Sequence, residues 1–151
     1  AAFYLVDKIR DEALSTLSVL NNTNKRTLLL SGDSQIACNK LRHTIPMTSV
    51  SGGLSAHAKM QHIKQAQDEG FKVAMTGDGV NDSPVLGAAH VSIAMGCGAD
   101  ITKSGADVIL LNNKLNSINL LVDIAHKTRR IIFQNYLLVD MDVKARGETE
   151  R

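Results

Sequence analysis

Residues 72–84 have the sequence Lys-Val-Ala-Met-Thr-Gly-Asp-Gly-Val-Asn-Asp-Ser-Pro, and this stretch decides the fold. Its first four residues, Lys72–Met75, form a short β-type run, and Gly77 and Gly79 predict a loop directly after it. Pro84 suits the first turn of a helix, where its missing N–H leaves no bond unmade. The stretch therefore predicts a strand, a polar loop and a helix in direct succession.

The same alternation extends over most of the chain. Five β-type runs are expected to be strands: Phe3–Val6, Thr27–Leu30, Lys72–Met75, Val91–Met95 and Val108–Leu111. Apolar residues at helical spacing separate several of them, at Asp11–Leu20, Asp33–His43 and Ser55–Glu69. This pattern predicts an α/β fold, a Rossmann-like parallel sheet flanked by helices. Right-handed crossovers place the loops after Leu30 and Met75 at one edge of the sheet, where α/β proteins bind ligands.

The composition limits the function. The 151 residues are 44% apolar, which suits one compact domain. The net charge of +2 is far too small for a nucleic-acid-binding surface, so no nucleic-acid partner is expected. No apolar stretch approaches the roughly 20 residues of a membrane-spanning helix, so this piece is expected to be soluble. The two cysteines lack the spacing of a zinc site or a disulfide framework.

The last third of the chain has a different pattern. In residues 114–138, apolar side chains recur at helical spacing with basic residues beside them. We expect this segment to form an amphipathic helix that extends beyond the α/β part in residues 1–113. Residues 139–151 are charged and lack a strong apolar period, so a frayed or disordered tail is expected there.

Two carboxylates, Asp78 and Asp82, lie four residues apart in the loop after the Lys72–Met75 strand. Hard oxygen ligands of this kind suit Mg²⁺, which is held by one or two carboxylates together with waters and a phosphate. Asn81 can bridge the loop to a phosphate. A second interpretation stays open, in which the loop is a polar turn and Asp82 only caps the helix that begins near Ser83.

Two further candidate positions follow from the other strands and helices. Ser31-Gly32-Asp33 comes directly after a predicted strand, and a hydroxyl, a glycine amide and a helix start in this order can hold a phosphate oxygen. Lys59, early in a predicted helix, can neutralise phosphate charge. Each signal is weak alone, because Asp33 also suits a helix cap and most lysines on helices are solvated. Together with Asp78 they predict a phosphoryl-transfer site that lacks a nucleophile.

The loop Thr76–Pro84 resembles the magnesium-binding hinge motif of P-type ATPases, and the three loops resemble motifs of the haloacid dehalogenase superfamily. The resemblance covers about Phe3–Asn135 and is closest to the heavy-metal branch, copper transporters and their relatives. Further segments that carry it are 6–13, 96–100, 106–111 and 127–135. It implies the C-terminal part of a phosphorylation domain, with a haloacid dehalogenase-like sheet that is incomplete.

The resemblance also implies roles for residues and small molecules. Mg²⁺ would be the cofactor, and ATP the substrate of the intact protein. The implied roles are Mg²⁺ binding by Asp78 and Asp82, phosphate or nucleotide binding by Ser31, Gly32, Asp33 and Asn81, and stabilisation of phosphate charge by Lys59. The family has a proline and an acidic residue shortly before that lysine, where this chain has Ala56 and Ala58.

The family's nucleophile is absent from this sequence. In these ATPases an aspartate in an Asp-Lys-Thr-Gly-Thr motif is phosphorylated by ATP and then hydrolysed, whereas Asp7-Lys8 here continues with Ile9-Arg10. We therefore expect a chain that is inactive alone and works with the remainder of a transporter, its nucleotide, actuator and membrane domains. The parent would lie in a membrane with this part on the cytoplasmic side. The transported cation, copper-like by resemblance, would bind elsewhere.

Two other functions stay open. A stand-alone haloacid dehalogenase-like phosphatase would need an N-terminal Asp-x-Asp nucleophile loop, which is not found. A truncated, non-catalytic domain would instead bind a partner or regulate an intact transporter through the helix Ile118–Tyr136. Phosphatase activity would favour the first of these, and burial of that helix against a second chain would favour the other.

Overall fold

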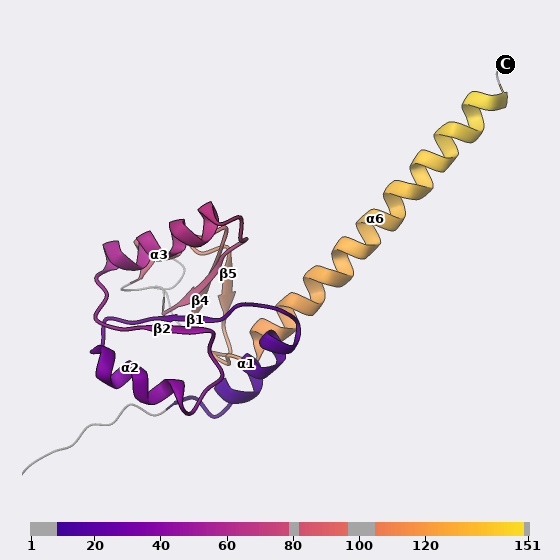
Figure 1. Cartoon of the computed structure of the whole chain (residues 1–151). Helices are drawn as coiled ribbons and strands as arrows, with labels where there is room; N and C mark the ends of the chain where they lie inside the picture. The colour runs from indigo at the N-terminus through magenta and orange to yellow at the C-terminus, as the bar shows by residue number, and fades with distance from the viewer. Residues whose placement is uncertain (1–8, 79–81, 97–104, 150–151) are drawn as a thin grey trace, which may run out of the picture. The chain divides into compact units, whose positions relative to one another are not determined.

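We describe residues 9–78, 82–96 and 105–149 in a computed structural model of the chain, with 140–149 as backbone only. The chain divides into two units, Ala1–Asn116 and Ser117–Arg151. Within the described residues the first unit contains the strands and the shorter helices, and the second consists of one helix, α6 (Ser117–Thr149) (Figure 1).

The first unit alternates helices and strands. In chain order its described elements are α1 (Ala13–Asn22), β1 (Leu28–Leu30), α2 (Gln35–Arg42), β2 (Ser49–Ser51), α3 (Ala56–Asp68), β3 (Ala74–Gly77), α4 (Ser83–Leu86), β4 (Val91–Met95) and β5 (Val108–Leu110). α2 and α3 each begin after a serine, Ser34 and Ser55, whose side chain accepts a backbone N–H three residues further on. After α3, Gly70 has a φ of +88°, a conformation that favours glycine at a helix end.

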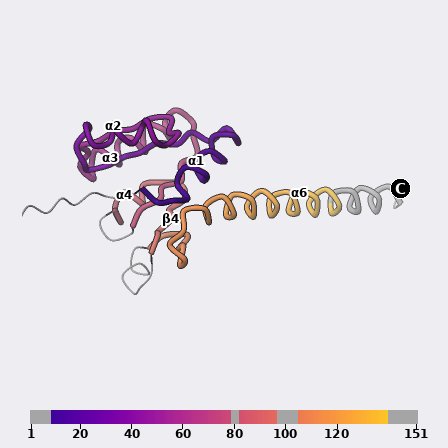
Figure 2. The backbone as a smooth tube through the Cα atoms, turned by 90° about the horizontal axis from the view of Figure 1, so that it is seen from below, coloured from indigo at the N-terminus to yellow at the C-terminus, as the bar shows by residue number. Residues whose placement is uncertain are grey.

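The strands form two parallel sheets. β1 pairs with β2, and β3, β4 and β5 form the second sheet in that order. In the second sheet Ala74 lies opposite Val91. α2 and α3 lie on opposite sides of β1 and β2 in Figure 1 and overlap when seen from below in Figure 2. The predicted α/β fold, with parallel strands flanked by helices, is confirmed.

The parallel sheet is incomplete, as predicted. Within the described residues β1 pairs on one side only, with β2, and β3 pairs on one side only, with β4. Side chains on these two edge strands remain accessible, since Leu28 on β1 is 47% exposed and Met75 on β3 is half-buried. The guanidinium of Arg26 lies 4.3 Å from the centre of the Phe71 ring. This contact joins the segments that lead into β1 and β3.

Buried side chains stabilise the first unit. In one group Ala13 and Leu17 of α1 pack with Ile45, and Leu115 packs against them. Further buried side chains come from α3, α4, β4 and β5, elements that adjoin one another in the fold: Ile63, Val85, Leu86, Ile93, Ala94 and Leu110. Burying one such aliphatic side chain contributes about 2 kcal/mol. The short helix α4 is thus anchored against the sheet directly after the Asp78–Asp82 loop.

A clip joins the start of α1 to the segment before α6. Arg10 donates to the carbonyl and side-chain oxygens of Asn113, at 2.8 and 3.2 Å, across 103 positions of sequence. The Leu115 N–H donates to the Glu12 carboxylate at 3.1 Å. The backbone N–H of Glu12 itself, and then that of Leu115, lower the pKa of the Glu12 carboxyl.

Some predicted strands differ from the observed ones. The predicted strand Lys72–Met75 is observed two residues later, as Ala74–Gly77, because pairing with β4 begins at Val91 and continues past Met75. β2 is absent from the prediction, because it has a single apolar residue between two serines and is stabilised by pairing with β1. The predicted strand Phe3–Val6 lies outside the described residues.

α6 is 33 residues long. Residues 139–149 lie in the segment for which the sequence predicts a frayed tail, and their backbone continues α6. Five of these eleven residues, Met141, Lys144, Ala145, Arg146 and Glu148, are good helix formers. In the part of the chain that the structure describes, no helix is long and apolar enough to cross a membrane. Several large apolar side chains in the C-terminal half of α6 are exposed: Ile131, Ile132, Phe133, Tyr136, Leu137, Leu138 and Val139.

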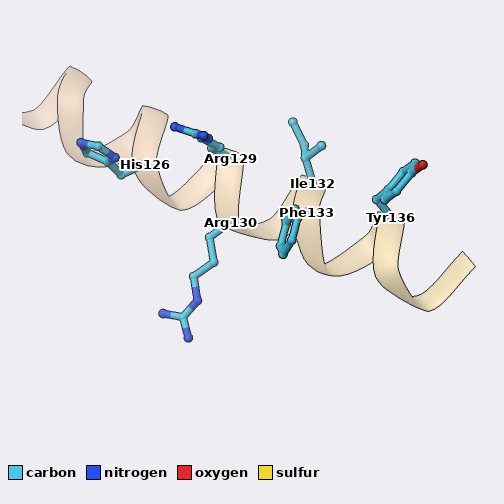
Figure 3. Close-up of a pocket in the computed structure, with 6 residues that line it drawn as sticks. All are labelled: His126, Arg129, Arg130, Ile132, Phe133 and Tyr136. Atoms are coloured by element: carbon cyan, nitrogen blue, oxygen red, sulfur yellow. The ribbon is translucent and has the colours of Figure 1, made fainter. Parts of the chain in front are cut away.

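A shallow hollow on α6 is shown in Figure 3. The six residues around it are His126, Arg129, Arg130, Ile132, Phe133 and Tyr136. All six come from one helix, so the hollow is a surface feature and lacks the enclosure that a small-molecule site needs.

Candidate functional site

Asp82 lies at the end of the loop after β3, directly before α4. Its side chain makes no capping hydrogen bond to α4. Instead Asp82 Oδ1 accepts a hydrogen bond from Lys59 Nζ at 2.8 Å, and the two side chains are only 22% and 14% exposed. The interpretation of Asp82 as a simple helix cap is therefore wrong. The structure joins two of the predicted site residues in one half-buried ion pair.

Gly77 makes room for this carboxylate. A Cβ atom at Gly77 would lie 3.3 Å from both Cβ and Oδ2 of Asp82, which is tighter than most real Cβ contacts, and 3.6 Å from Leu86 Cδ2, which is an ordinary contact distance. The last residue of β3 thus lets the Asp82 side chain fold back against the strand. Pro84 occupies the first turn of α4, as predicted, where it lacks no needed donor.

The start of α3 places Lys59 beside this loop and next to the loop after β1. Ser55 caps α3, and the Lys59 N–H bonds to the Ser55 carbonyl at 3.0 Å, so the lysine lies one turn into the helix. The residue before the cap, Leu54, donates its N–H to the Ser31 carbonyl at 2.9 Å. The start of α3 thus bonds to the loop after β1 through Leu54 and to the loop after β3 through Lys59 and Asp82.

The loop after β1 has its own hydrogen bonds. Ser31 Oγ donates to Asp33 Oδ2 at 2.8 Å and accepts from the Asp33 N–H at 3.1 Å. The cap of α2 is Ser34, whose side chain accepts from the Ala37 N–H at 3.3 Å. The interpretation of Asp33 as the cap of this helix is therefore wrong. Gly32 is exposed and lies against the loop before α3.

Two predicted site residues lie elsewhere in the Asp78–Asp82 loop. Asp78 is exposed and comes one residue after β3. Asn81 lies outside the described residues. Among the residues that the structure does describe, there is no group of three His, Cys, Asp or Glu side chains placed to hold a metal. The donor set that remains, two carboxylates at a strand end, fits Mg²⁺, which takes oxygen ligands and keeps several waters.

Gln35 supports the phosphate-loop candidate and is missed by the sequence analysis. Its Oε1 accepts from the Gly52 N–H at 2.6 Å, and its Nε2 donates to Val50 O at 3.3 Å. A Cβ at Gly52 would lie 2.8 Å from the Asp33 carbonyl, so only glycine fits there. The adjacent glycines 52 and 53 are the signal in the sequence that could have indicated this close approach.

Asp107 and Ser92 form a polar clip between β4 and the start of β5. Asp107 Oδ2 accepts from the Ser92 N–H at 2.8 Å and from its hydroxyl at 2.7 Å. These two donors, the backbone one first, lower the pKa of the Asp107 carboxyl. We assign this pair a structural role, because it ties neighbouring strands together.

Comparisons with known proteins agree with the geometry. A family model for haloacid dehalogenase-like hydrolases matches residues 53–121. Cation-transporting P-type ATPase B of Mycobacterium tuberculosis is 33% identical over 137 residues, which are 91% of this chain and 18% of that protein. Copper-transporting ATPase 1 of Mus musculus is 33% identical over 133 residues, which are 88% of this chain and 9% of that protein. The chain is homologous to the heavy-metal P-type ATPases.

A solved structure supports the same relationship. The catalytic CPx-ATPase domain CopB-B superposes with a TM-score of 0.71 at 35% identity, covering 80% of this chain and 49% of that chain. The chain spans less than a fifth of the P-type ATPases described above. The family match includes Lys59, Asp78 and Asp82, whereas Ser31–Asp33 lies before it. The predicted resemblance to this family is thus confirmed.

Proposed function

We propose that this chain supplies the Mg²⁺- and phosphate-binding loops of a heavy-metal P-type ATPase, in which an aspartyl-phosphate is formed and hydrolysed to drive transport of a copper-like cation. The observation that supports this most is the ion pair between Lys59 and Asp82, which brings a cation from α3 to the carboxylate loop after β3. A half-buried ammonium beside a carboxylate in the loop after a strand is suited to a ligand with phosphate charge.

The residues have separate roles in this proposal. Asp78 and Asp82 hold Mg²⁺, which neutralises charge on the transferred phosphoryl group when bound. Lys59 places its ammonium toward the same charge, and the donors of Ser31 and Gly32 orient the phosphoryl oxygens. The resemblance assigns the remaining two contacts, to phosphate or nucleotide, to Asp33 and Asn81.

The nucleophile comes from another part of the protein. A carboxylate oxygen attacks the γ-phosphorus of ATP, ADP leaves, and water later hydrolyses the acyl phosphate to return the carboxylate and inorganic phosphate. Among the described residues, β1 and β3 each pair on one side only, and a strand that carries this aspartate would fit at their other edges, near the loops of both sheets. This chain alone is then unable to complete the reaction.

The partners are the remaining parts of the transporter. The nucleotide, actuator and membrane domains act with residues 1–113, and the helix in 114–138 leads toward the membrane stalk. The parent lies in a membrane with this part on the cytoplasmic side. By the resemblance, the transported cation binds in the membrane domain and not in this part.

A Mg²⁺ titration of the chain by NMR tests the metal site. The wild type should bind weakly, and Asp78→Asn should abolish the shifts around β3 and α4. Asp68→Asn, at the exposed end of α3, is the charge-matched control and should bind as the wild type does. Unchanged titration in Asp78→Asn would refute the assignment.

Incubation with labelled ATP tests the missing nucleophile. We expect no stable acyl phosphate on this chain, because the phosphorylated aspartate lies elsewhere. Label on the chain would contradict the proposal. Turnover of a generic phosphoester with Mg²⁺ would instead support a stand-alone phosphatase.

A further inference from the structure

The hydroxyl of Ser31 is already occupied within its own loop. A hydroxyl has one proton to donate and two lone pairs that accept. The proton of Ser31 Oγ goes to the Asp33 carboxylate at 2.8 Å, and the Asp33 N–H takes one lone pair at 3.1 Å. The remaining lone pair repels a deprotonated phosphoryl oxygen. Ser31 can therefore donate to such an oxygen only after its proton leaves Asp33.

The backbone around this hydroxyl is fixed. The Ser31 N–H donates to the Ser51 carbonyl at 2.9 Å, and the Ser31 carbonyl accepts from the Leu54 N–H at 2.9 Å. A change of partner must therefore come from the side chain, by rotation of the O–H about the Cβ–Oγ bond or of the whole hydroxyl about χ1. The Asp33 carboxylate does not cap α2, because the Ser34 side chain does so.

We propose that Asp33 is a positioning residue that holds the Ser31 hydroxyl in the ligand-free site, and that phosphate binds by displacing Asp33 as the acceptor of that proton. The proposal rests on the proposed function, since it takes the loop after β1 as a phosphate site. No covalent bond changes, and the proton stays on Ser31. The carboxylate competes with the ligand, so only an anion that attracts the hydroxyl more strongly than Asp33 binds.

The first experiment needs no ligand. Hα–Hβ scalar couplings of Ser31 measured by NMR report whether its side chain keeps one χ1 rotamer. We expect one rotamer in the wild type and averaged couplings in Asp33→Ala. Averaged couplings in the wild type, or a single rotamer in Asp33→Ala, would show that Asp33 does not hold the hydroxyl.

The second experiment titrates inorganic phosphate in the presence of Mg²⁺ and follows backbone amide shifts. Asp33→Asn should bind phosphate about fivefold more tightly than the wild type, because a neutral acceptor competes less well than a carboxylate. In a Ser31→Ala background the same substitution should change the affinity little. Glu69→Gln, an exposed position at the end of α3, controls for the loss of one negative charge.

The outcomes separate the two proposals. If Asp33→Asn strengthens binding equally with and without the Ser31 hydroxyl, plain charge repulsion explains the effect and the positioning role is overturned. Weaker phosphate binding in Asp33→Asn would also overturn it. A wild type that keeps one Ser31 rotamer but binds no phosphate would overturn the phosphate site of the proposed function, together with the displacement step.

Discussion

Replacing Lys59 with methionine removes the ammonium from Asp82 and keeps a side chain of similar length on α3. The Nζ–Oδ1 distance is 2.8 Å, so the bare attraction at an effective dielectric constant of 20 is about 6 kcal/mol. Desolvation of both groups and the ordering of the long lysine side chain offset most of this. A hydrogen bond between charged groups contributes roughly 1.5–3 kcal/mol net. We therefore expect Lys59→Met to lower the free energy of unfolding by about 2 kcal/mol.

Urea unfolding followed by circular dichroism measures this loss. With an m-value of about 2 kcal/mol per M, the midpoint should fall by roughly 1 M while the m-value stays constant. Lys64→Met is the matched control, because Lys64 lies on the same helix and is exposed. It should change stability by less than about 0.5 kcal/mol.

The double variant Lys59→Met with Asp82→Asn separates the loss of the ion pair from the effect of placing an apolar methionine on α3. It should regain part of the lost stability, because no uncompensated carboxylate remains half-buried. The reasoning would be refuted if Lys59→Met and Lys64→Met had equal effects. It would also be refuted if the two single substitutions at the pair were additive.

Four further substitutions test features of the fold. Thr16→Val should stabilise the chain by up to about 1 kcal/mol, because Thr16 Oγ1 is buried with no hydrogen-bond partner. Thr27→Val should destabilise it, because Thr27 Oγ1 donates a hydrogen bond to Asn21 Oδ1 at 3.0 Å. Melting temperatures of the two variants and the wild type measure both effects. Asp107 has a lowered pKa in the folded chain, so its contribution is present above the unfolded pKa of about 3.9 and is lost as pH falls through the folded value. Between pH 7 and pH 2 the unfolding midpoint of Asp107→Asn should therefore fall less than that of the wild type. The same pH profile in both proteins would contradict this. Gly52→Ala should cost about 1–3 kcal/mol in urea unfolding, since its Cβ would meet backbone atoms at 2.8 Å, and a neutral effect would show that the loop adapts.

The sequence predicts best the elements that depend on local pattern. β4 is observed as Val91–Met95, as predicted, because four of its five residues, Val91, Ile93, Ala94 and Met95, are apolar and mark a short β-type run in the sequence. β2 depends on β1 for its stability, and no pattern within three residues can indicate that. The start of β3 is likewise set by its register with β4.

The site shows the same division. The presence of Asp78 and Asp82 after a strand indicates an oxygen-ligand loop from sequence alone. The choice between a helix cap and an ion pair for Asp82 depends on Lys59, which lies 23 positions away and reaches the loop only through the packing of α3. The cap of α2 is a similar case, because Asp33 and Ser34 are both good cap residues and only the backbone geometry selects Ser34.

The hydrogen bonds that join Arg10 and Glu12 to the segment before α6 bring the described start of the α/β unit next to its last residues. Arg10 and Asn113 meet although almost the whole unit lies between them in sequence. A unit whose entry and exit are adjacent can be inserted into a longer chain without being opened, because its neighbours need to span only a short gap. In such an arrangement a pull applied at the base of the following helix is transmitted to α1 across these hydrogen bonds as well as along the backbone from β5.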